Sequence, residues 1–298
     1  MNPIYLDHAA TSYPKPDPVL RAVRYALTDA CGNPGRGAHP LSENAAELVY
    51  SCREEAAGFF EAEPENVVFT PGATYALNFA IQGLAEPGCH ILCDNFCHNA
   101  TRRPILAMAK AGYCSVDFFD ASGTTEETLE SLEEKLRPET TIVVATHSSN
   151  ICSKILPVAE IGAFCKRHGL YFIVDAAQSA GHLPISLREQ KISALAVPGH
   201  KGLCGPMGVG MLVSAPGIRY RPVIYGGAGI ASREVGMPEE LPERLEAGTL
   251  PVPAIAGLLA GMQYVKTEGI WNLRAREESL SRAFTEGLEK IHLQSFGI

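Results

Sequence analysis

The sequence lacks the features that mark membrane, secreted and nucleic-acid-binding proteins. Its longest apolar stretch near the C-terminus, residues 254–262, is too short to span a bilayer. Residues 1–5 contain no basic region and no signal-like apolar segment. There is no Lys/Arg-rich run, and 33 acidic against 25 basic residues give a net charge of −8, which argues against a nucleic-acid-binding surface. We therefore predict a cytoplasmic protein without membrane or nucleic-acid partners.

A paired cysteine framework is also missing. The nine cysteines are an odd number without evident pairing, and reduced thiols are expected in a chain without a secretion signal. Cys89, Cys93 and Cys97, with His90 and His98 beside them, invite interpretation as a metal site. Structural zinc sites, however, favour two tight pairs such as C-x2-C separated by a longer loop. We therefore interpret the three cysteines as core residues and predict no metal site.

Two further absences narrow the choice of fold and cofactor. The sequence contains no internal repeat and no low-complexity segment. No complete G-x-G-x-x-G motif follows a predicted strand, so a nicotinamide-binding domain is poorly supported. A length of 298 residues, with 46% hydrophobic and 19% charged residues, is typical of an ordinary globular protein. Such a chain has room for one large domain, or for a large domain and part of another.

Short apolar runs alternate with helical patterns through the middle of the chain. The apolar runs predict strands at residues 67–69, 91–93, 115–119, 141–146, 170–175, 194–197 and 209–213. The 3.6-residue patterns predict helices at residues 17–28, 42–60, 74–84, 100–111, 125–136, 158–168, 255–267 and 271–291. This alternation predicts an α/β fold in which a mainly parallel sheet is sandwiched by helices.

Polar residues follow several of the predicted strands. Asp175, Asn150, Lys201 and residues 70–74 all come after a strand. Because ligands of such sheets bind at the carboxyl ends of the strands, we expect these residues to converge there. In residues 72–74 (GAT), the turn from strand to helix offers backbone N–H groups to a phosphate. Taken alone, the same turn favours a plain helix cap, because Thr is a common capping residue.

Eight motifs in register resemble a known family. They are residues 5–11 (YLDHAAT), 32–37 (GNPGRG), 69–74 (FTPGAT), 97–99 (CHN), 149–150 (SN), 174–178 (VDAAQ), 199–206 (GHKGLCGP) and 244–249 (RLEAGT). In this order and spacing they resemble class V aminotransferases, and within them the cysteine desulfurase-like group. The resemblance runs from residue 5 to about residue 265. It implies the large domain of the pyridoxal phosphate (PLP)-dependent transferase fold type I.

The resemblance implies PLP as cofactor and assigns its two central partners. Lys201 matches the lysine whose amine binds the PLP aldehyde and, once freed, acts as the base at the substrate α-carbon. Asp175 matches the carboxylate that holds the pyridine nitrogen protonated, so that the ring withdraws electrons. The lysine must be neutral for this chemistry, although a free lysine has a pKa of about 10.4. We expect burial to lower the pKa of Lys201.

The remaining matched positions complete the predicted site. His98 matches the histidine that stacks on the PLP ring and shuttles protons, although a capping or core histidine is the alternative. The other matched residues are Ala73, Thr74 and His200 at the phosphate, Gln178 at the phenolic oxygen, Asn150 near that oxygen and the substrate carboxylate, and Thr249 at the phosphate of the neighbouring subunit. The role of Thr249 implies a homodimer with shared active sites.

The chain departs from the family pattern at three places. Pro198 stands where the family often has Ser or Thr, which removes one hydroxyl contact, and Ser153 stands where it usually has Gly. None of the nine cysteines aligns with the family's nucleophile, which is expected, with the arginine that binds the substrate carboxylate, beyond residue 298. We therefore expect a truncated chain with an N-terminal arm (1–14), a PLP-binding large domain (15–253) and linking helices (254–298) at the start of a small domain.

Several functions fit these observations. The first is a cysteine desulfurase, which converts L-cysteine to L-alanine and enzyme-bound sulfane sulfur for a possible acceptor protein, or the related selenocysteine lyase. A class V aminotransferase or epimerase acting on another small amino acid is the second. The third is a PLP-binding but catalytically silent module.

Overall fold

The computed structural model describes residues 4–35, 37–230 and 235–290. Two of the predicted positions lie outside these ranges: Arg36, in the GNPGRG motif, and Ile291, the last residue of the final predicted helix.

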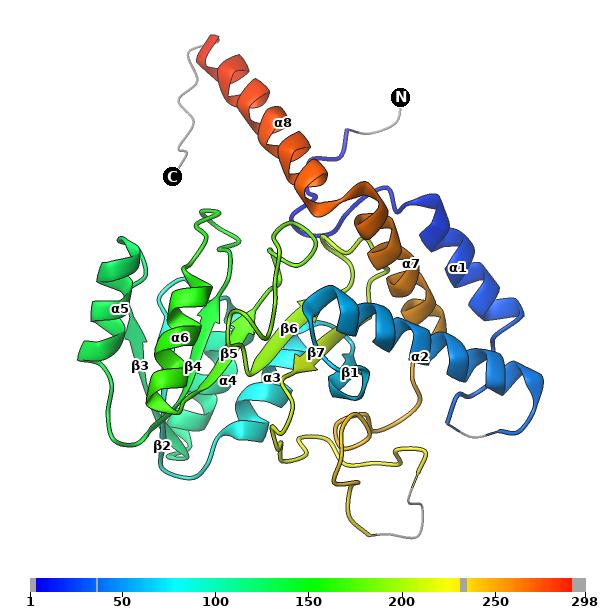
Figure 1. The fold of residues 1–298 in the computed structure, drawn as a ribbon, viewed down its shortest axis with the longest axis horizontal. Helices are drawn as coiled ribbons and strands as arrows, with labels where there is room; N and C mark the ends of the chain where they lie inside the picture. Colours follow the sequence, from blue (N-terminus) through cyan, green and yellow to red (C-terminus); the bar gives the residue numbers. More distant parts are fainter. Residues whose placement is uncertain (1–3, 36, 231–234, 291–298) are drawn as a thin grey trace.

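A seven-stranded sheet forms the centre of the molecule (Figure 1). Its strands are β1 (Val67–Thr70), β2 (Cys89–Asp94), β3 (Cys114–Phe119), β4 (Thr140–Thr146), β5 (Tyr171–Asp175), β6 (Ala194–Pro198) and β7 (Gly210–Ser214). The strand order is β1-β7-β6-β5-β4-β2-β3, and only β7 runs antiparallel to its neighbours. The predicted mainly parallel sheet is thus confirmed, and each predicted strand is found with its ends moved by no more than two residues.

The helices also follow the prediction closely. They are α1 (Asp17–Thr28), α2 (Pro40–Phe60), α3 (Ala73–Leu84), α4 (Asn99–Lys110), α5 (Thr125–Glu134), α6 (Val158–His168), α7 (Val252–Glu268) and α8 (Ile270–Lys290), with a short 3-10 helix at Pro64–Asn66. The largest difference is the start of α7, which precedes the predicted start by three residues. Pro253 stands in its first turn, where proline costs no backbone hydrogen bond.

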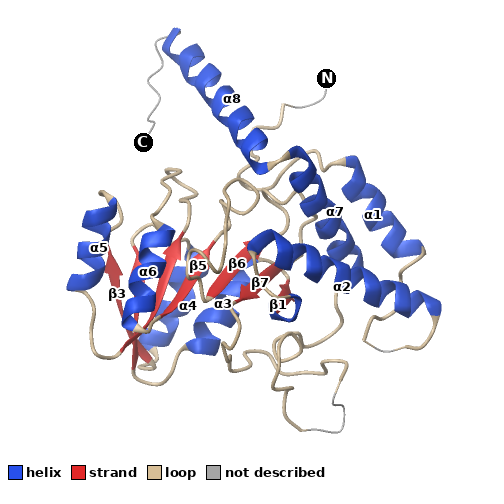
Figure 2. Cartoon of the chain, viewed as in Figure 1, coloured by secondary structure: helices blue, strands red, loops and turns tan. Residues whose placement is uncertain are grey.

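Two hydrophobic cores lie on the two faces of the sheet, beneath the helices that Figure 2 shows packed around the strands. In β5, Phe172 and Val174 belong to one core and Ile173 to the other, as the two-residue period of a strand requires. Helices α2, α5, α6 and α7 cover the first core, and α3 and α4 cover the second. Burial on both faces explains why the strands are apolar runs rather than alternating patterns.

The last two helices differ in how they contact the body. Helix α7 packs against α1 and α2, and nine of its residues are buried. Helix α8 has no buried residue and projects away from the sheet in Figure 1, with the side chains of Trp271, Leu280 and Phe284 exposed. The predicted division at residue 253 stays a prediction. Within the described residues, no helix is long and apolar enough to cross a membrane.

Candidate active site

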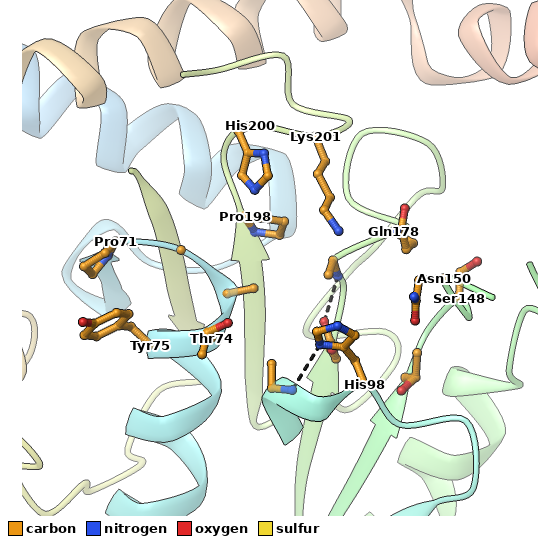
Figure 3. Close-up of a pocket in the computed structure, with 16 residues that line it drawn as sticks. Pro71, Thr74, Tyr75, His98, Ser148, Asn150, Gln178, Pro198, His200 and Lys201 are labelled. Carbon is orange, nitrogen blue, oxygen red and sulfur yellow. Dashed lines mark hydrogen bonds between the residues drawn. The ribbon is translucent and has the colours of Figure 1, made fainter. Parts of the chain in front are cut away.

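A cavity of about 320 Å³ lies at the carboxyl ends of β1, β4, β5 and β6, where helices α3 and α4 begin (Figure 3). It is lined by Pro71, Gly72, Ala73, Thr74, Tyr75, His98, Ala100, Thr146, Ser148, Asn150, Asp175, Ala177, Gln178, Pro198, His200 and Lys201. Eight of the nine predicted site residues are in this set, and Thr249 is not. The expected convergence at the strand ends is therefore confirmed for Asp175, Asn150, Lys201 and residues 71–74, whereas Thr70 does not line the cavity.

Lys201 enters the cavity from the loop that follows β6. Figure 3 shows its side chain reaching toward the ring of His98, with His200 beside it. The side chain is half-buried, and this burial lowers the pKa of Lys201, while the negative charge of Asp175 acts in the opposite direction. The direction of the pKa shift is the one expected from the sequence. It makes the neutral amine more available than in a free lysine.

Asp175 ends β5 and is buried, with 2% of its surface exposed. Its Oδ1 accepts a hydrogen bond of 2.9 Å from the backbone N–H of Ala177. Burial raises the pKa of Asp175, and the Ala177 N–H, His98 and Lys201 each work against that rise. A cation placed against this carboxylate would favour its ionised form in the same way.

His98 is both a helix cap and a lining residue of the cavity. It is the N-cap of α4, because its Nδ1 accepts a 3.1 Å hydrogen bond from the backbone N–H of Ala100. The same ring lines the cavity (Figure 3). Since Nδ1 is an acceptor in this cap, the neutral ring carries its proton on Nε2. The cap therefore orients the imidazole and sets its tautomer.

The start of α3 forms the opposite wall. Gly72 precedes the helix with φ of +154°, a conformation open essentially only to glycine, and no side chain caps this end. Ala73 and Thr74, the first two helical residues, line the cavity. Uncapped N–H groups at a helix start attract anions. This arrangement fits a phosphate.

His200 supplies a second observation that points to an anion. Its Nδ1 is buried without a hydrogen-bond partner in the described part of the chain. Burial lowers the pKa of His200, and the charges of Lys201 and Lys15 add to this effect. A neutral imidazole can donate one N–H, so the unpartnered nitrogen can serve an acceptor such as a phosphate oxygen. A buried polar atom without a partner is costly unless a ligand satisfies it.

Gln178 and Asn150 stand on the side of the cavity away from α3 (Figure 3). The Nε2 of Gln178 donates a 3.2 Å hydrogen bond to the carbonyl of Ala9, in the N-terminal segment. Asn150 lies in the turn after β4, which also contains Ser153 at φ of +57°. Ser153 thus adopts the left-handed conformation that suits the glycine usual in the family. The turn forms here at the cost of roughly 1 kcal/mol of backbone strain.

Thr249 does not line this cavity. It lines a separate cavity of about 680 Å³, together with Tyr50, Arg53 and residues 33–35, and a smaller one of about 150 Å³ whose wall includes Pro71 and Tyr75. Arg53 and Glu246 form a buried ion pair with an N–O distance of 2.6 Å beside it. The placement of Thr249 away from Lys201 within one chain is compatible with its predicted role across a subunit interface, which stays a prediction.

Sequence reasoning missed two residues close to the site. Asp94 ends β2, is fully buried, and accepts hydrogen bonds from the backbone N–H groups of Phe96 and Thr146, each 2.8 Å long. Burial raises the pKa of Asp94, and the negative charge of Asp175 adds to this rise. Its position at a strand end, like that of Asp175, was the available signal. Lys15 is the second missed residue, and it contacts the carbonyl oxygen of His200.

Two of the three cysteines are buried core residues, as interpreted from the sequence. Cys89 and Cys93 point into the same hydrophobic core from β2, while Leu92 points to the other face. Cys97, after β2, is only half-buried and packs against the edge of that core. Within the described ranges, no group of three His, Cys, Asp or Glu side chains is placed to hold a metal ion.

Comparisons with known proteins agree with this geometry. The family model for aminotransferase class-V matches residues 4–297. The probable cysteine desulfurase of Pyrococcus abyssi is 32% identical over 301 residues, covering 99% of this chain and 75% of that protein. The probable cysteine desulfurase of Methanothermobacter thermautotrophicus is 33% identical, covering 90% of this chain and 68% of that protein.

Among solved structures, the apo structure of cysteine desulfurase from Thermococcus onnurineus NA1 is similar, with a TM-score of 0.89 and 31% identity. The match covers 99% of this chain and 75% of that chain. Fold, motif order and sequence likeness over nearly the whole length lead to one conclusion. The chain belongs to the aminotransferase class-V family.

Proposed function

We propose that the chain binds PLP and acts on a small amino acid, as a cysteine desulfurase or the related selenocysteine lyase. Enzymes of the aminotransferase class-V family typically use PLP. The observation that carries the proposal is one cavity in which the amine of Lys201, the buried carboxylate of Asp175 and the unpartnered Nδ1 of His200 meet. The likeness to proteins named cysteine desulfurase supports L-cysteine as the substrate.

The residues present fit the cofactor. The uncapped start of α3, at Ala73 and Thr74, and the free nitrogen of His200 would hold the phosphate. Asp175 would hold the pyridine nitrogen in its protonated form, and the amide of Gln178 would face the phenolic oxygen. When bound, PLP supplies an electron sink for the negative charge that develops at the substrate α-carbon.

The chain's own groups then divide the proton chemistry. The neutral amine of Lys201 would take the α-proton of the substrate, which its lowered pKa favours near neutral pH. The imidazole of His98 would lie over the ring and offer its Nε2–H to the substrate, because Nδ1 is held by the α4 cap. Asn150 would orient the substrate carboxylate from the turn after β4.

Attack on the substrate sulfur is a separate step. None of the nine cysteines, all of which lie in the described ranges, lines the cavity. We therefore assign substrate binding and α-proton removal to the residues that line the cavity. We assign no sulfur-accepting role to any of the nine thiols. Thr249 would complete the phosphate site of a second subunit, which makes the active form a homodimer with shared sites. A sulfur-acceptor protein would be the further partner.

The α-proton step can be tested without measuring sulfur release. The chain is mixed with PLP and L-alanine in deuterium oxide, and loss of the α-proton signal is followed by NMR. We expect exchange that falls by about 10²–10⁴-fold in Lys201→Ala, which removes the general base. Lys191→Ala, which removes an exposed lysine, is the matched control and is expected to keep the exchange rate.

Cofactor attachment and product identity decide the rest. Borohydride reduction is expected to attach the cofactor to the peptide that contains Lys201, and attachment at another lysine would refute the assignment. L-cysteine is expected to yield alanine and sulfane sulfur when the sulfur-accepting thiol is supplied. A keto acid as product would instead favour an aminotransferase, and binding without any α-proton exchange would favour a silent module.

A further inference from the structure

Residues 5–15, here called the N-terminal clamp, form a compact segment over the end of the sheet. The hydroxyl of Tyr5 donates to the carbonyls of Asp7, at 2.9 Å, and Thr11, at 3.1 Å, and its ring meets the ring of Tyr13 edge-on at 5.3 Å. The clamp reaches the end of β5 through the bond from Gln178 to Ala9. It therefore has its own internal order and a fixed contact with the candidate site.

The clamp reaches the end of β6 through four donors on one oxygen. The carbonyl oxygen of His200 accepts hydrogen bonds from the Ser12 N–H (3.1 Å), the Ser12 Oγ (3.2 Å), the Thr11 Oγ1 (3.0 Å) and the Lys15 Nζ (2.8 Å). Lys15 also donates to the Ser12 Oγ at 2.7 Å. A carbonyl oxygen has two lone pairs, so the donors share it, and the shortest of the four bonds is the one from the cation.

This oxygen belongs to the peptide group that leads into Lys201. Because a peptide group is planar, holding the His200 oxygen also sets the orientation of the Lys201 backbone N and Cα. On the other side, the carbonyl of Lys201 accepts a 2.9 Å bond from the N–H of Cys204. The backbone of Lys201 is thus held at both ends, and the direction in which its side chain leaves the loop is determined.

The half-buried position of Lys15 calls for an explanation. Burial lowers the pKa of Lys15, which means that placing its ammonium here costs free energy. A lysine without a specific partner in the protein usually extends its ammonium group into water. Here the ammonium turns inward to a backbone carbonyl and to the hydroxyl of Ser12.

We propose that Lys15 is a positioning residue for Lys201: with the hydroxyls of Thr11 and Ser12, it holds the His200–Lys201 peptide so that the Lys201 amine points into the cavity. The inference rests on the proposed function, since it is the amine's reach to a substrate proton that the clamp serves. Proton transfer needs heavy atoms within roughly 2.6–3.2 Å. A displacement of about 1 Å at such a group costs on the order of 10²-fold in rate.

The test compares Lys15→Met, which removes the ammonium, with Lys15→Arg, which keeps a cationic donor. Lys191→Met is the matched control, because Lys191 also donates to a backbone carbonyl, that of Arg188 at 3.0 Å. The first readout is competitive acetylation of the lysines in the protein without PLP, read as the labelling rate of Lys201 against pH. The second is the rate of α-proton exchange with PLP present, alongside Tm.

We expect Lys15→Met to change the pH dependence of the acetylation rate of Lys201. We also expect it to slow α-proton exchange by about 10–100-fold under conditions in which the variant is fully folded. Lys15→Arg should restore most of the exchange, and Lys191→Met should leave both readouts unchanged. Thr11→Val, which removes one neutral donor and keeps the side-chain shape, should have a smaller effect in the same direction.

The proposal is overturned if Lys15→Met leaves the labelling profile and the exchange rate at wild-type values, or if the loss of exchange only follows the unfolded fraction. Failure of the proposed function gives a different pattern. In that case PLP produces no exchange in any variant, while the labelling of Lys201, measured without PLP, still responds to Lys15→Met and is still restored by Lys15→Arg.

Discussion

Buried carboxylates are handled differently in two regions of the molecule. Glu246, beside the Thr249 cavity, receives two hydrogen bonds from Arg53, at 2.9 and 2.6 Å, and one from the N–H of Phe69. At the candidate site, Asp94 and Asp175 receive only backbone N–H groups and form no ion pair within the part of the chain that the structure describes. Burial raises the pKa of all three carboxyl groups. Arg53, paired directly with Glu246, opposes the rise there, whereas His98 and Lys201 oppose it at Asp175 and backbone N–H groups oppose it at Asp94.

The difference separates a complete region, whose buried charges are paired within the chain, from an incomplete region, where buried polar groups lack such partners in the part of the chain that the structure describes. Arg53 lies over the ring of Phe69 and donates to the carbonyl of Val67, so the pair ties α2 and the segment before α7 to β1. Every partner there comes from the chain itself. At the cavity, Asp175 and His200 keep unmet capacity for a cation and an anion, respectively. Unmet polar capacity that is buried at strand ends is a sign of a binding site.

The largest predicted effect breaks the complete region. Glu246→Gln removes the charge and leaves the guanidinium of Arg53 buried and unpaired, which typically costs about 3–5 kcal/mol. We expect a loss of that order in the free energy of unfolding, measured by urea denaturation. The matched control is Glu55→Gln, which breaks the pair with Lys266; because the Lys266 side chain is 68% exposed, its ammonium stays solvated and the loss should be under about 1 kcal/mol.

Equal losses in Glu246→Gln and Glu55→Gln would show that burial does not distinguish the two pairs. The comparison between a complete region and an incomplete one would then lose its energetic basis.

The fold and most of the site could be predicted from local patterns. Apolar runs fix the strands because both faces of the sheet are buried, and the polar residue that ends each run falls at the ligand-binding edge. This is why Asp175, Asn150 and Lys201 could be placed together from sequence alone. The motif at residues 72–74 could be placed because a strand-to-helix turn has a recognisable composition.

Contacts between distant residues could not be predicted in this way. Arg53 and Glu246 are 193 positions apart, and Lys15 and His200 are 185 positions apart. Neither residue type nor spacing indicates that a particular surface-type lysine turns inward to a backbone carbonyl. The helix cap formed by His98 was foreseen only as an alternative to its predicted site role, whereas the structure shows a ring that both caps α4 and lines the cavity.

A smaller predicted effect concerns pH and the incomplete region. Burial raises the pKa of Asp94 to about 7. Its folded pKa therefore lies above the unfolded value of about 3.9, so its contribution to stability is full below that value and is lost as pH rises through about 7. Between pH 5 and 7 this loss amounts to about 2 kcal/mol. His147, whose pKa burial lowers to about 4, contributes in the opposite direction over the same interval.

Asp94→Asn separates the two contributions. In the wild type the contributions of Asp94 and His147 offset each other. In the variant the effect of His147 is unopposed, so between pH 5 and 7 the variant's stability should rise by about 2 kcal/mol relative to that of the wild type. Urea denaturation at several pH values checks this. Parallel pH profiles for the two proteins would show that Asp94 is not the carboxyl group that titrates.

The smallest predicted effect sharpens the comparison at Thr249. If the buried charges around Arg53 and Glu246 need no ligand, this region serves to hold Thr249 in position rather than to bind a ligand within one chain. Thr249→Val keeps the side-chain shape and removes the hydroxyl, so the free energy of unfolding should stay within about 0.5 kcal/mol of wild type. A hydrogen bond to a charged phosphate is worth about 1.5–3 kcal/mol, so PLP affinity should fall at least tenfold. The fall should occur only where the protein is dimeric, because the hydroxyl is supplied to the other subunit's site.

The prediction is tested by measuring PLP affinity at several protein concentrations, with sedimentation to follow dimer formation. If Thr249→Val leaves PLP affinity unchanged in a stable dimer, Thr249 does not contact the phosphate. If the variant loses PLP affinity as a monomer, Thr249 acts in the site of its own chain, and the two regions are then not separate.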